Sequence, residues 1–143
     1  MKKGLEGANH MISVTLRQQL VQAINVHVHA HFIILFGSGA TGNMTDDSDL
    51  DIAYLSDHTL SAYDRFLLAG QLARLAGREV DLVDIKQIDP ILTMQIFTEG
   101  LVIDCQNPNE LTRQQMRAYS MYAAFSEERA PIVQSIKDQG SVF

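Results

Sequence analysis

The strongest constraint in this chain is a Gly-Ser turn separated by ten residues from an Asp-x-Asp pair. The turn is Gly37-Ser38 and the pair is Asp49 and Asp51, with one apolar run before the turn and another around the pair. Backbone N–H groups of a tight Gly/Ser turn can bind phosphate oxygens. Two carboxylates spaced by two along a strand point to the same face, because strand side chains alternate. Such oxygen ligands bind Mg²⁺, so the segment suits a metal-bound triphosphate.

The pattern Gly-Ser-x10-Asp-x-Asp resembles the signature of the polymerase-β-like nucleotidyltransferases, and within them that of the minimal nucleotidyltransferases. The resemblance extends from about His31 to about Gln106. It includes a further acidic residue, Asp81, in an apolar segment, and a closing strand that ends at Asp104. The resemblance implies the nucleotidyltransferase fold, an α/β (α+β) domain.

The resemblance also assigns roles to individual residues. The nucleotide-binding residues would be Gly37, Ser38 and Gly39. The catalytic carboxylates, which would also be the metal ligands, would be Asp49, Asp51 and Asp81. These carboxylates would hold two Mg²⁺ ions, and two metals can stabilise both the attacking and the leaving oxygen of an in-line displacement.

The activity implied by this resemblance is transfer of AMP from ATP to a hydroxyl acceptor. Many minimal nucleotidyltransferases are antitoxins of HEPN-type toxins. The resemblance therefore implies that the partner is a HEPN-type ribonuclease toxin and that the acceptor is one of its tyrosines. AMP addition would silence the toxin, which makes the chain an antitoxin of a toxin–antitoxin pair.

Two other functions stay open. Many family members carry arginines inside the turn, at the places that Gly39 and Thr41 occupy here. Their absence favours a catalytically weak antitoxin that neutralises its partner by binding and occlusion. The second alternative is a transferase that acts on a small molecule such as an aminoglycoside, although the chain is short for it.

Length and charge limit the remaining possibilities. The 143 residues fit one domain, and we expect a flexible leader at 1–10 and a single nucleotidyltransferase domain with a C-terminal helix at 11–143. An apolar content of 46% is enough for a core. The net charge of −6 argues against long nucleic acid as a partner, because that needs clustered Lys and Arg.

Cysteine usage and hydropathy predict the compartment. Cys105 is the single cysteine, so no internal disulfide can form. A reducing cytoplasm is the simplest setting for such a chain. No apolar run reaches about 18 residues, so we expect no association with a membrane.

Hydrophobic periodicity predicts about four strands backed by helices, in a mixed sheet. The expected helices are 15–30, 60–75, 90–97 and 109–130. The expected strands are 31–36, 50–55, 79–85 and 101–104. Between Gly37 and Ser48 a single helical turn is the most that we expect. Pro131 should break or kink the last helix.

Two rival motifs overlap the turn. Gly37, Gly39 and Gly42 match the Gly-x-Gly-x-x-Gly dinucleotide fingerprint. Only seven residues separate Gly42 from the next apolar run, which is too short for the crossover helix of that motif. An EF-hand loop starting at Asp47 would place Ile52 where glycine is required, so it is discarded.

Other polar and aromatic residues have less specific interpretations. Asp84 is the fallback for Asp81, but three positions along a strand place it on the opposite face. We interpret Asp46 and Asp47 as a solvated turn. We expect structural or incidental roles for the histidines at alternate positions, His27, His29 and His31. The aromatic and Met residues of the last helix are expected in the core, with a partner interface as the alternative.

Overall fold

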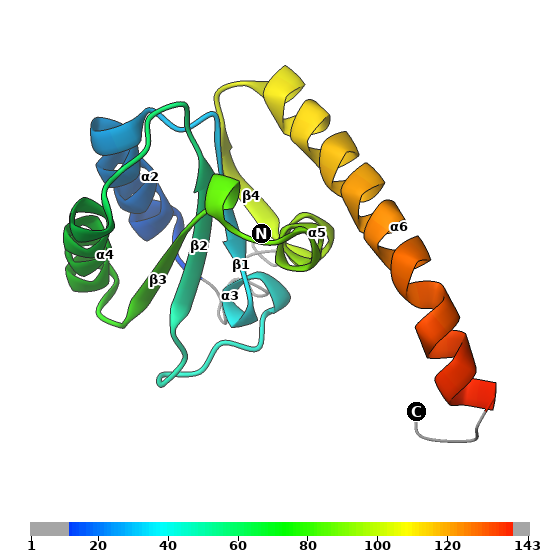
Figure 1. Cartoon of the computed structure of the whole chain (residues 1–143). Helices are drawn as coiled ribbons and strands as arrows, with labels where there is room; N and C mark the ends of the chain where they lie inside the picture. The colour runs from blue at the N-terminus through cyan, green and yellow to red at the C-terminus, as the bar shows by residue number, and fades with distance from the viewer. Residues whose placement is uncertain (1–11, 139–143) are drawn as a thin grey trace, which may run out of the picture.

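The computed structural model of the protein describes residues 12–138, and the side chains of residues 12–125. The leader expected at 1–10 lies outside these residues. Within residues 12–138, four strands form one sheet with the order β3-β2-β1-β4 (Figure 1). They are β1 (Phe32–Phe36), β2 (Leu50–Leu55), β3 (Val80–Asp84) and β4 (Leu101–Cys105). Because β2 pairs parallel with β3 while β1 pairs antiparallel with β2 and β4, the expected mixed sheet is confirmed.

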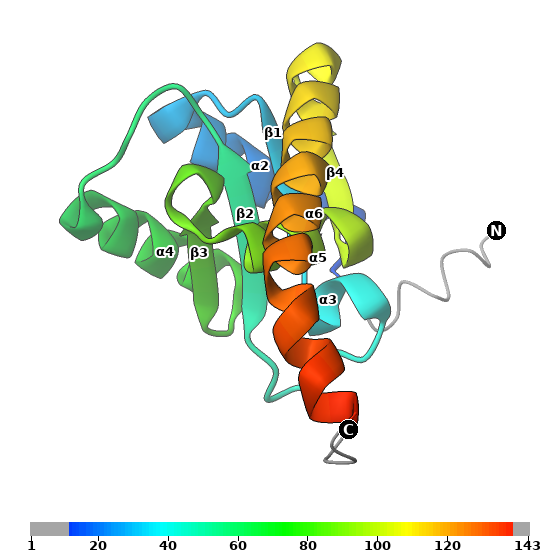
Figure 2. The same ribbon diagram turned by 45° about the vertical axis from the view of Figure 1, so that its right-hand side comes forward.

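Helices cover both faces of the sheet. They are α2 (Val14–Val28), α3 (Ser38–Thr41), α4 (Ala62–Ala76), α5 (Pro90–Glu99) and α6 (Pro108–Asp138), with a 3-10 turn, η2, at Ile85–Gln87. Helices α2 and α4 pack together on one face. Helix α5 lies on the other face, and Figure 2 shows α6 running past it on the outside.

The side-chain alternation of β2 divides the core between the two faces. Leu50, Ile52 and Tyr54 are fully buried in the cluster formed with α2 and α4. Ala53 and Leu55 belong to the second cluster, which includes residues of α5. Asp51 lies between Leu50 and Ile52 in the chain, so its side chain points to the α5 side of the sheet.

Capping residues determine where the helices begin and end. The hydroxyl of Ser13 accepts a hydrogen bond from the Leu16 N–H, and that of Ser61 accepts one from the Asp64 N–H, each at 3.0 Å. Asp89 caps α5 in the same way, with Pro90 at the first helical position. Gly77 ends α4 with φ 71°, a left-handed conformation that glycine adopts without strain.

The last helix differs from the sequence prediction. The expected break at Pro131 was wrong, because α6 continues through that residue to Asp138. Proline removes one backbone donor and crowds one preceding turn. The neighbouring turns keep their own hydrogen bonds, so the helix can continue beyond it.

Candidate active site

The Gly-Ser turn lies directly at the end of β1. Gly37 has φ 69° and ψ −146°, and Ser38 starts the single turn of helix α3. The N–H groups of Ala40 and Thr41 donate to the Gly37 carbonyl, which closes the turn. The first N–H groups of such a turn have no partner within it. The turn therefore presents backbone donors at the same end of the sheet as the start of β2.

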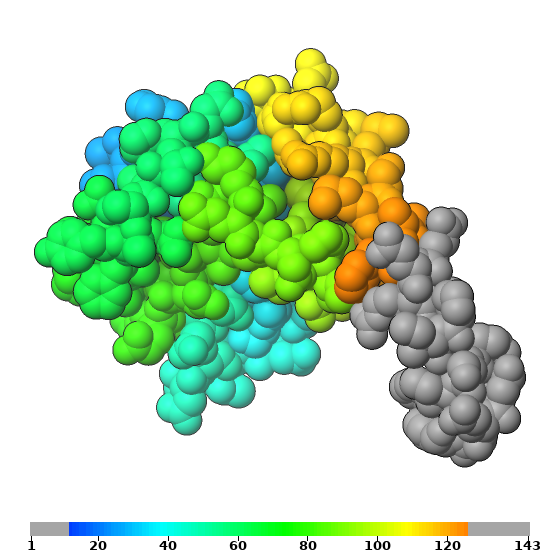
Figure 3. All heavy atoms as spheres, viewed as in Figure 1, coloured from blue at the N-terminus to red at the C-terminus, as the bar shows by residue number. Residues whose placement is uncertain are grey.

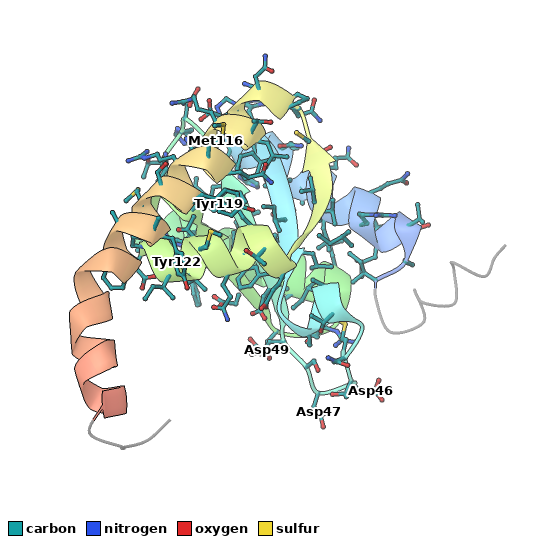
Figure 4. The ribbon with its side chains drawn as sticks, turned by 90° about the vertical axis from the view of Figure 1, so that its right-hand side faces the viewer. Asp46, Asp47, Asp49, Met116, Tyr119 and Tyr122 are labelled. Atoms are coloured by element: carbon teal, nitrogen blue, oxygen red, sulfur yellow. The ribbon has the colours of Figure 1, made fainter. Side chains whose placement is uncertain are left out.

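Strand pairing brings two of the predicted carboxylates side by side. Asp51 in β2 lies opposite Asp81 in the parallel strand β3. On its other side Asp51 lies opposite Phe36, the residue before Gly37. Asp49 comes just before β2 and is exposed, next to the loop that carries Asp46 and Asp47 at its tip (Figure 4). Three strands thus place the turn and the carboxylates at one sheet end.

Gly37 and Asp51 are in close contact. A Cβ atom added to Gly37 would overlap the Oδ2 atom of Asp51. Only glycine can therefore occupy this position beside the carboxylate, both for space and for its positive φ. The sequence pattern alone gave no sign of this contact, because the two residues are fourteen positions apart.

The Asp51 carboxylate has a perturbed acidity. Burial raises its pKa above the ordinary value, and the negative charges of Asp81 and Asp49 raise it further. All three carboxylates therefore lie within electrostatic range of one another. A cation bound among them would offset this repulsion.

This pKa shift predicts the effect of Asp51→Asn on stability. Because the pKa of Asp51 is raised in the folded state, the neutral carboxyl favours folding over the charged one. This contribution to stability is fully present below about pH 4 and is lost as the pH rises through the folded-state pKa. At pH 7 with EDTA, Asp51→Asn should therefore raise the thermal midpoint, and the gain should disappear below pH 4. Asp46→Asn, at the exposed loop tip, is the control. An equal midpoint for wild type and Asp51→Asn at pH 7 would contradict the electrostatic description.

The fallback residue Asp84 has a different role. Its side chain is 2% exposed and lies on the α4 face of the sheet, where Asp84 is paired in register with Tyr54. Its Oδ1 atom accepts a hydrogen bond from the Lys86 N–H and so caps η2. Burial and the charge of Asp84 raise the pKa of Tyr54 to about 12. Asp84 is therefore a structural residue of the core.

Arg78 connects the acidic loop to the start of β3. Its Nη1 atom donates to the carbonyl of Thr45 at 2.8 Å and to that of Ser48 at 3.0 Å. These two carbonyls flank Asp46 and Asp47, and the second immediately precedes Asp49. The guanidinium group therefore fixes the segment that leads into the carboxylate pair. No sequence motif marks Arg78, because its two acceptors lie 33 and 30 positions away along the chain.

We expect Arg78→Ala to affect both stability and site geometry. Loss of two hydrogen bonds from a charged donor should lower the free energy of unfolding by about 1–3 kcal/mol. The loosened loop should exchange its backbone amide hydrogens roughly tenfold faster, because local opening of the segment becomes easier. Amide hydrogen exchange between Thr45 and Asp49 measures this. Arg74→Ala, four residues earlier on the exposed surface of α4, should change neither quantity. Equal exchange rates in both variants would refute the positioning role.

Two further cations, Arg65 and Lys86, lie at the opposite end of the sheet. Arg65 donates to Gln87 at 3.0 Å, and Lys86 donates to Thr59 at 2.8 Å. Strand β2 precedes Arg65, and strand β3 precedes Lys86. Both strands start at the acidic site, so the length of a strand, about 15 Å or more, separates each cation from that site. Arg78 is on the acidic side.

Within the described part of the chain, His27, His29 and His31 do not form a metal cluster. His27 lies in the last turn of α2, His29 ends that helix with φ 49°, and His31 precedes β1. His31 contacts Asp57 at 3.0 Å and Asn107 at 3.3 Å. Their expected structural or incidental roles remain the simplest interpretation.

A cavity of about 220 Å³ opens beside Asp51. It is lined by Phe36, Gly37, Asp51, Leu92, Gln95, Ile96 and Glu99. Helix α5 therefore forms a wall opposite the Gly-Ser turn. Sequence reasoning assigned no site residue to α5, because its pattern is that of an ordinary short helix.

These features together define a nucleotidyltransferase: a mixed sheet that presents a glycine turn and paired carboxylates at one end. The chain belongs to the polymerase β nucleotidyltransferase family, whose profile matches residues 18–109. The protein adenylyltransferase MntA of Shewanella oneidensis is 35% identical over 105 residues, which are 73% of this chain and 74% of that protein. The protein adenylyltransferase MntA of Aphanizomenon flos-aquae is 22% identical over 112 residues, which are 71% of this chain and 75% of that protein.

Solved structures show the same similarity. A crystal structure of a toxin–antitoxin with AMP-PNP matches with a TM-score of 0.77 and 28% identity, over 85% of this chain and 98% of that one. A structure of a tri-AMPylated Shewanella oneidensis HEPN toxin in complex with MNT antitoxin matches with a TM-score of 0.73 and 26% identity. The match covers 86% of this chain and 97% of that one. The nucleotidyltransferase fold implied by the sequence is thereby confirmed.

Among residues 12–138, no helix is both long enough and apolar enough to cross a bilayer.

Proposed function

We propose that this protein transfers AMP from ATP to a tyrosine hydroxyl of a HEPN-type ribonuclease toxin and so neutralises it as an antitoxin. The observation that carries the proposal is the register of β2 and β3, which sets Asp51 beside Asp81 with Gly37 against Asp51. The relatives support it, since they include protein adenylyltransferases and a complex of an AMPylated HEPN toxin with its MNT antitoxin.

Asp49, Asp51 and Asp81 would hold the Mg²⁺ ions. Their chemistry fits, because Mg²⁺ prefers carboxylate oxygens and the repulsion around Asp51 favours a bound cation. Among the described residues, no three acidic, His or Cys side chains already converge as a metal site does. Asp49 and Asp81 are exposed, so both side chains are free to turn toward an ion. When bound, Mg²⁺ would neutralise charge on the phosphates.

The chain's own residues would position the reactants. Backbone N–H groups of Ser38 and Gly39, with the Ser38 hydroxyl, would bind the β- and γ-phosphates. The acceptor oxygen attacks the α-phosphorus, the new O–P bond forms, and the bond to the β-phosphate breaks. Pyrophosphate leaves with that electron pair. The acceptor proton passes to a carboxylate oxygen of Asp81. Positioning and charge supply most of the catalysis.

Labelled ATP distinguishes this reaction from phosphoryl transfer. The purified chain is mixed with Mg²⁺ and the HEPN-type protein encoded beside it, using ATP labelled at either the α- or the γ-phosphate. Label should appear on the partner only from the α-position, with release of pyrophosphate. Transfer of γ-label would overturn the assignment as a nucleotidyltransferase.

A binding antitoxin without catalysis is the second candidate, and the turn carries the observation that favours it. Gly39 is buried, and an added Cβ would lie 3.0 Å from the Met44 Cε atom and 3.3 Å from the Leu35 Cγ atom. Thr41 is exposed and carries no charge. The turn thus offers no guanidinium group to the triphosphate. Under this alternative, the partner's ribonuclease is silenced without ATP.

A further inference from the structure

The surface that leads away from the catalytic carboxylates is continuous with a second cavity. The first cavity extends from Asp51 to Gln95 and Glu99 of α5. The second, of about 320 Å³, is lined by those same two residues and by Ile91, Met94, Thr98 and Tyr122. The two cavities therefore form one groove that runs from Asp51, across α5, to the side of α6.

The walls of this groove have the composition of a protein-binding surface. Ile91 is 41% exposed and Tyr122 is 40% exposed, although both are large and apolar in their bodies. Aromatic and Met side chains are enriched where proteins bind one another. Figure 3 shows that α5 and the first half of α6 form one continuous surface. Among the residues that line the outer cavity, Glu99 is the charged one.

The direction of the groove follows from α6. In Figure 4, Tyr122 is the one of the three labelled α6 residues closest to the acidic end of the molecule, while Met116 and Tyr119 lie further up the helix. Neither Met116 nor Tyr119 lines the outer cavity. A chain segment in the groove would therefore pass Tyr122 and Ile91 before it reaches Leu92 and Asp51.

We infer that this groove, which we call the α5–α6 groove, binds the acceptor segment of the partner protein. The inference rests on the proposed function, since that reaction requires a hydroxyl at the carboxylates and the groove is a route that ends there. The occupant is a segment of the partner in which an apolar side chain packs between Ile91, Met94 and Tyr122. Its hydroxyl side chain extends past Gln95 into the inner cavity.

Tyr122→Ala and Ile91→Glu test the groove in the full-length chain. Each should raise the KM for the partner at least about tenfold and weaken partner binding measured by calorimetry to a similar degree. Binding of a fluorescent ATP analogue with Mg²⁺ should not change, because neither residue lies at the turn. Both side chains are exposed, so the thermal midpoint should also stay at its wild-type value, which excludes misfolding.

Two tyrosine variants are matched controls. Tyr119→Ala removes an aromatic side chain that is 50% exposed one turn earlier on α6, and Tyr63→Ala removes one that is 69% exposed on α4. Both should keep KM and partner binding within about twofold of wild type. If Tyr119→Ala weakened binding as much as Tyr122→Ala, the partner would lie on the outer face of α6 and the inference would be wrong.

The two readouts separate this inference from the proposed function. If the wild type transfers no AMP but Tyr122→Ala still weakens partner binding, the groove stands and the proposed reaction fails. If wild type transfers AMP and both groove variants keep the wild-type KM and affinity, the groove is refuted and the reaction stands. Self-association that Tyr122→Ala abolishes, without any effect on the partner, would also refute it.

Discussion

Asp49→Ala combined with Asp51→Ala should lower the rate of AMP transfer by roughly 10³-fold or more, because these carboxylates would hold the ions that neutralise the triphosphate. The measurement is single-turnover transfer of α-labelled AMP to the partner. Partner affinity should not change, since neither residue lies in the outer part of the α5–α6 groove. The thermal midpoint should not fall, because the substitutions remove repulsion between like charges.

The same loop supplies a matched control for this double variant. Asp46 and Asp47 are exposed at the loop tip and carry the same formal charge as Asp49 and Asp51 (Figure 4). Asp46→Ala with Asp47→Ala should keep transfer within about twofold, since loss of a distant surface charge has little effect in salt. Equal losses in both double variants would mean that overall acidity, rather than the Asp49 and Asp51 positions, supports the reaction.

Gly37→Ala should have the second-largest effect. The added methyl group would overlap the Asp51 carboxylate, and the residue would be held at φ 69°, which costs a non-glycine residue about 1–3 kcal/mol. Relief of the overlap requires Asp51 or the turn to move. Because a displacement of about 1 Å can cost 10²-fold, we expect transfer to fall by roughly that factor.

Gly42→Ala separates the two causes. Gly42 has φ 80°, so its alanine variant suffers similar backbone strain, but an added Cβ would meet nothing within 4 Å. Urea denaturation should show comparable losses of stability for both variants. The rate of AMP transfer should stay within a few-fold of wild type for Gly42→Ala but not for Gly37→Ala. If Gly42→Ala lost as much activity as Gly37→Ala, strain in the turn would be the cause, and the contact with Asp51 would be irrelevant.

The sequence predicted the elements well where one local pattern decides them. The apolar runs correctly predicted the four described strands. The helix expected at 60–75 begins after the cap residue Ser61 and ends at Gly77 in the structure. The alternation rule correctly separated Asp81 from Asp84 onto opposite faces. Pro131 shows the limit of such local rules. The cost of one proline in a helix predicted a break, but α6 is long enough to continue through that residue to Asp138.

The candidate site was predictable only in part. The spacing of Asp49 and Asp51 predicts a common direction, but β2 starts at Leu50, so strand alternation fixes the direction of Asp51 alone. The register that sets Asp51 beside Asp81, and the contact of Gly37 with Asp51, depend on pairing between distant segments. The hydrogen bonds of Arg78 likewise join residues thirty or more positions apart. No sequence motif marks the α5 residues that line the cavity beside Asp51, because they reach it only through the position of the helix on the sheet.

Intact mass spectrometry of the partner tests the central claim most directly. The partner is incubated with Mg²⁺, ATP and either the wild-type chain or the Asp49/Asp51 double alanine variant. We predict that the partner gains one or more AMP units with wild type and none with the variant, and that its ribonuclease activity falls only in the first case. An unmodified partner that is nevertheless silenced equally by both proteins would contradict the claim and establish neutralisation by occlusion.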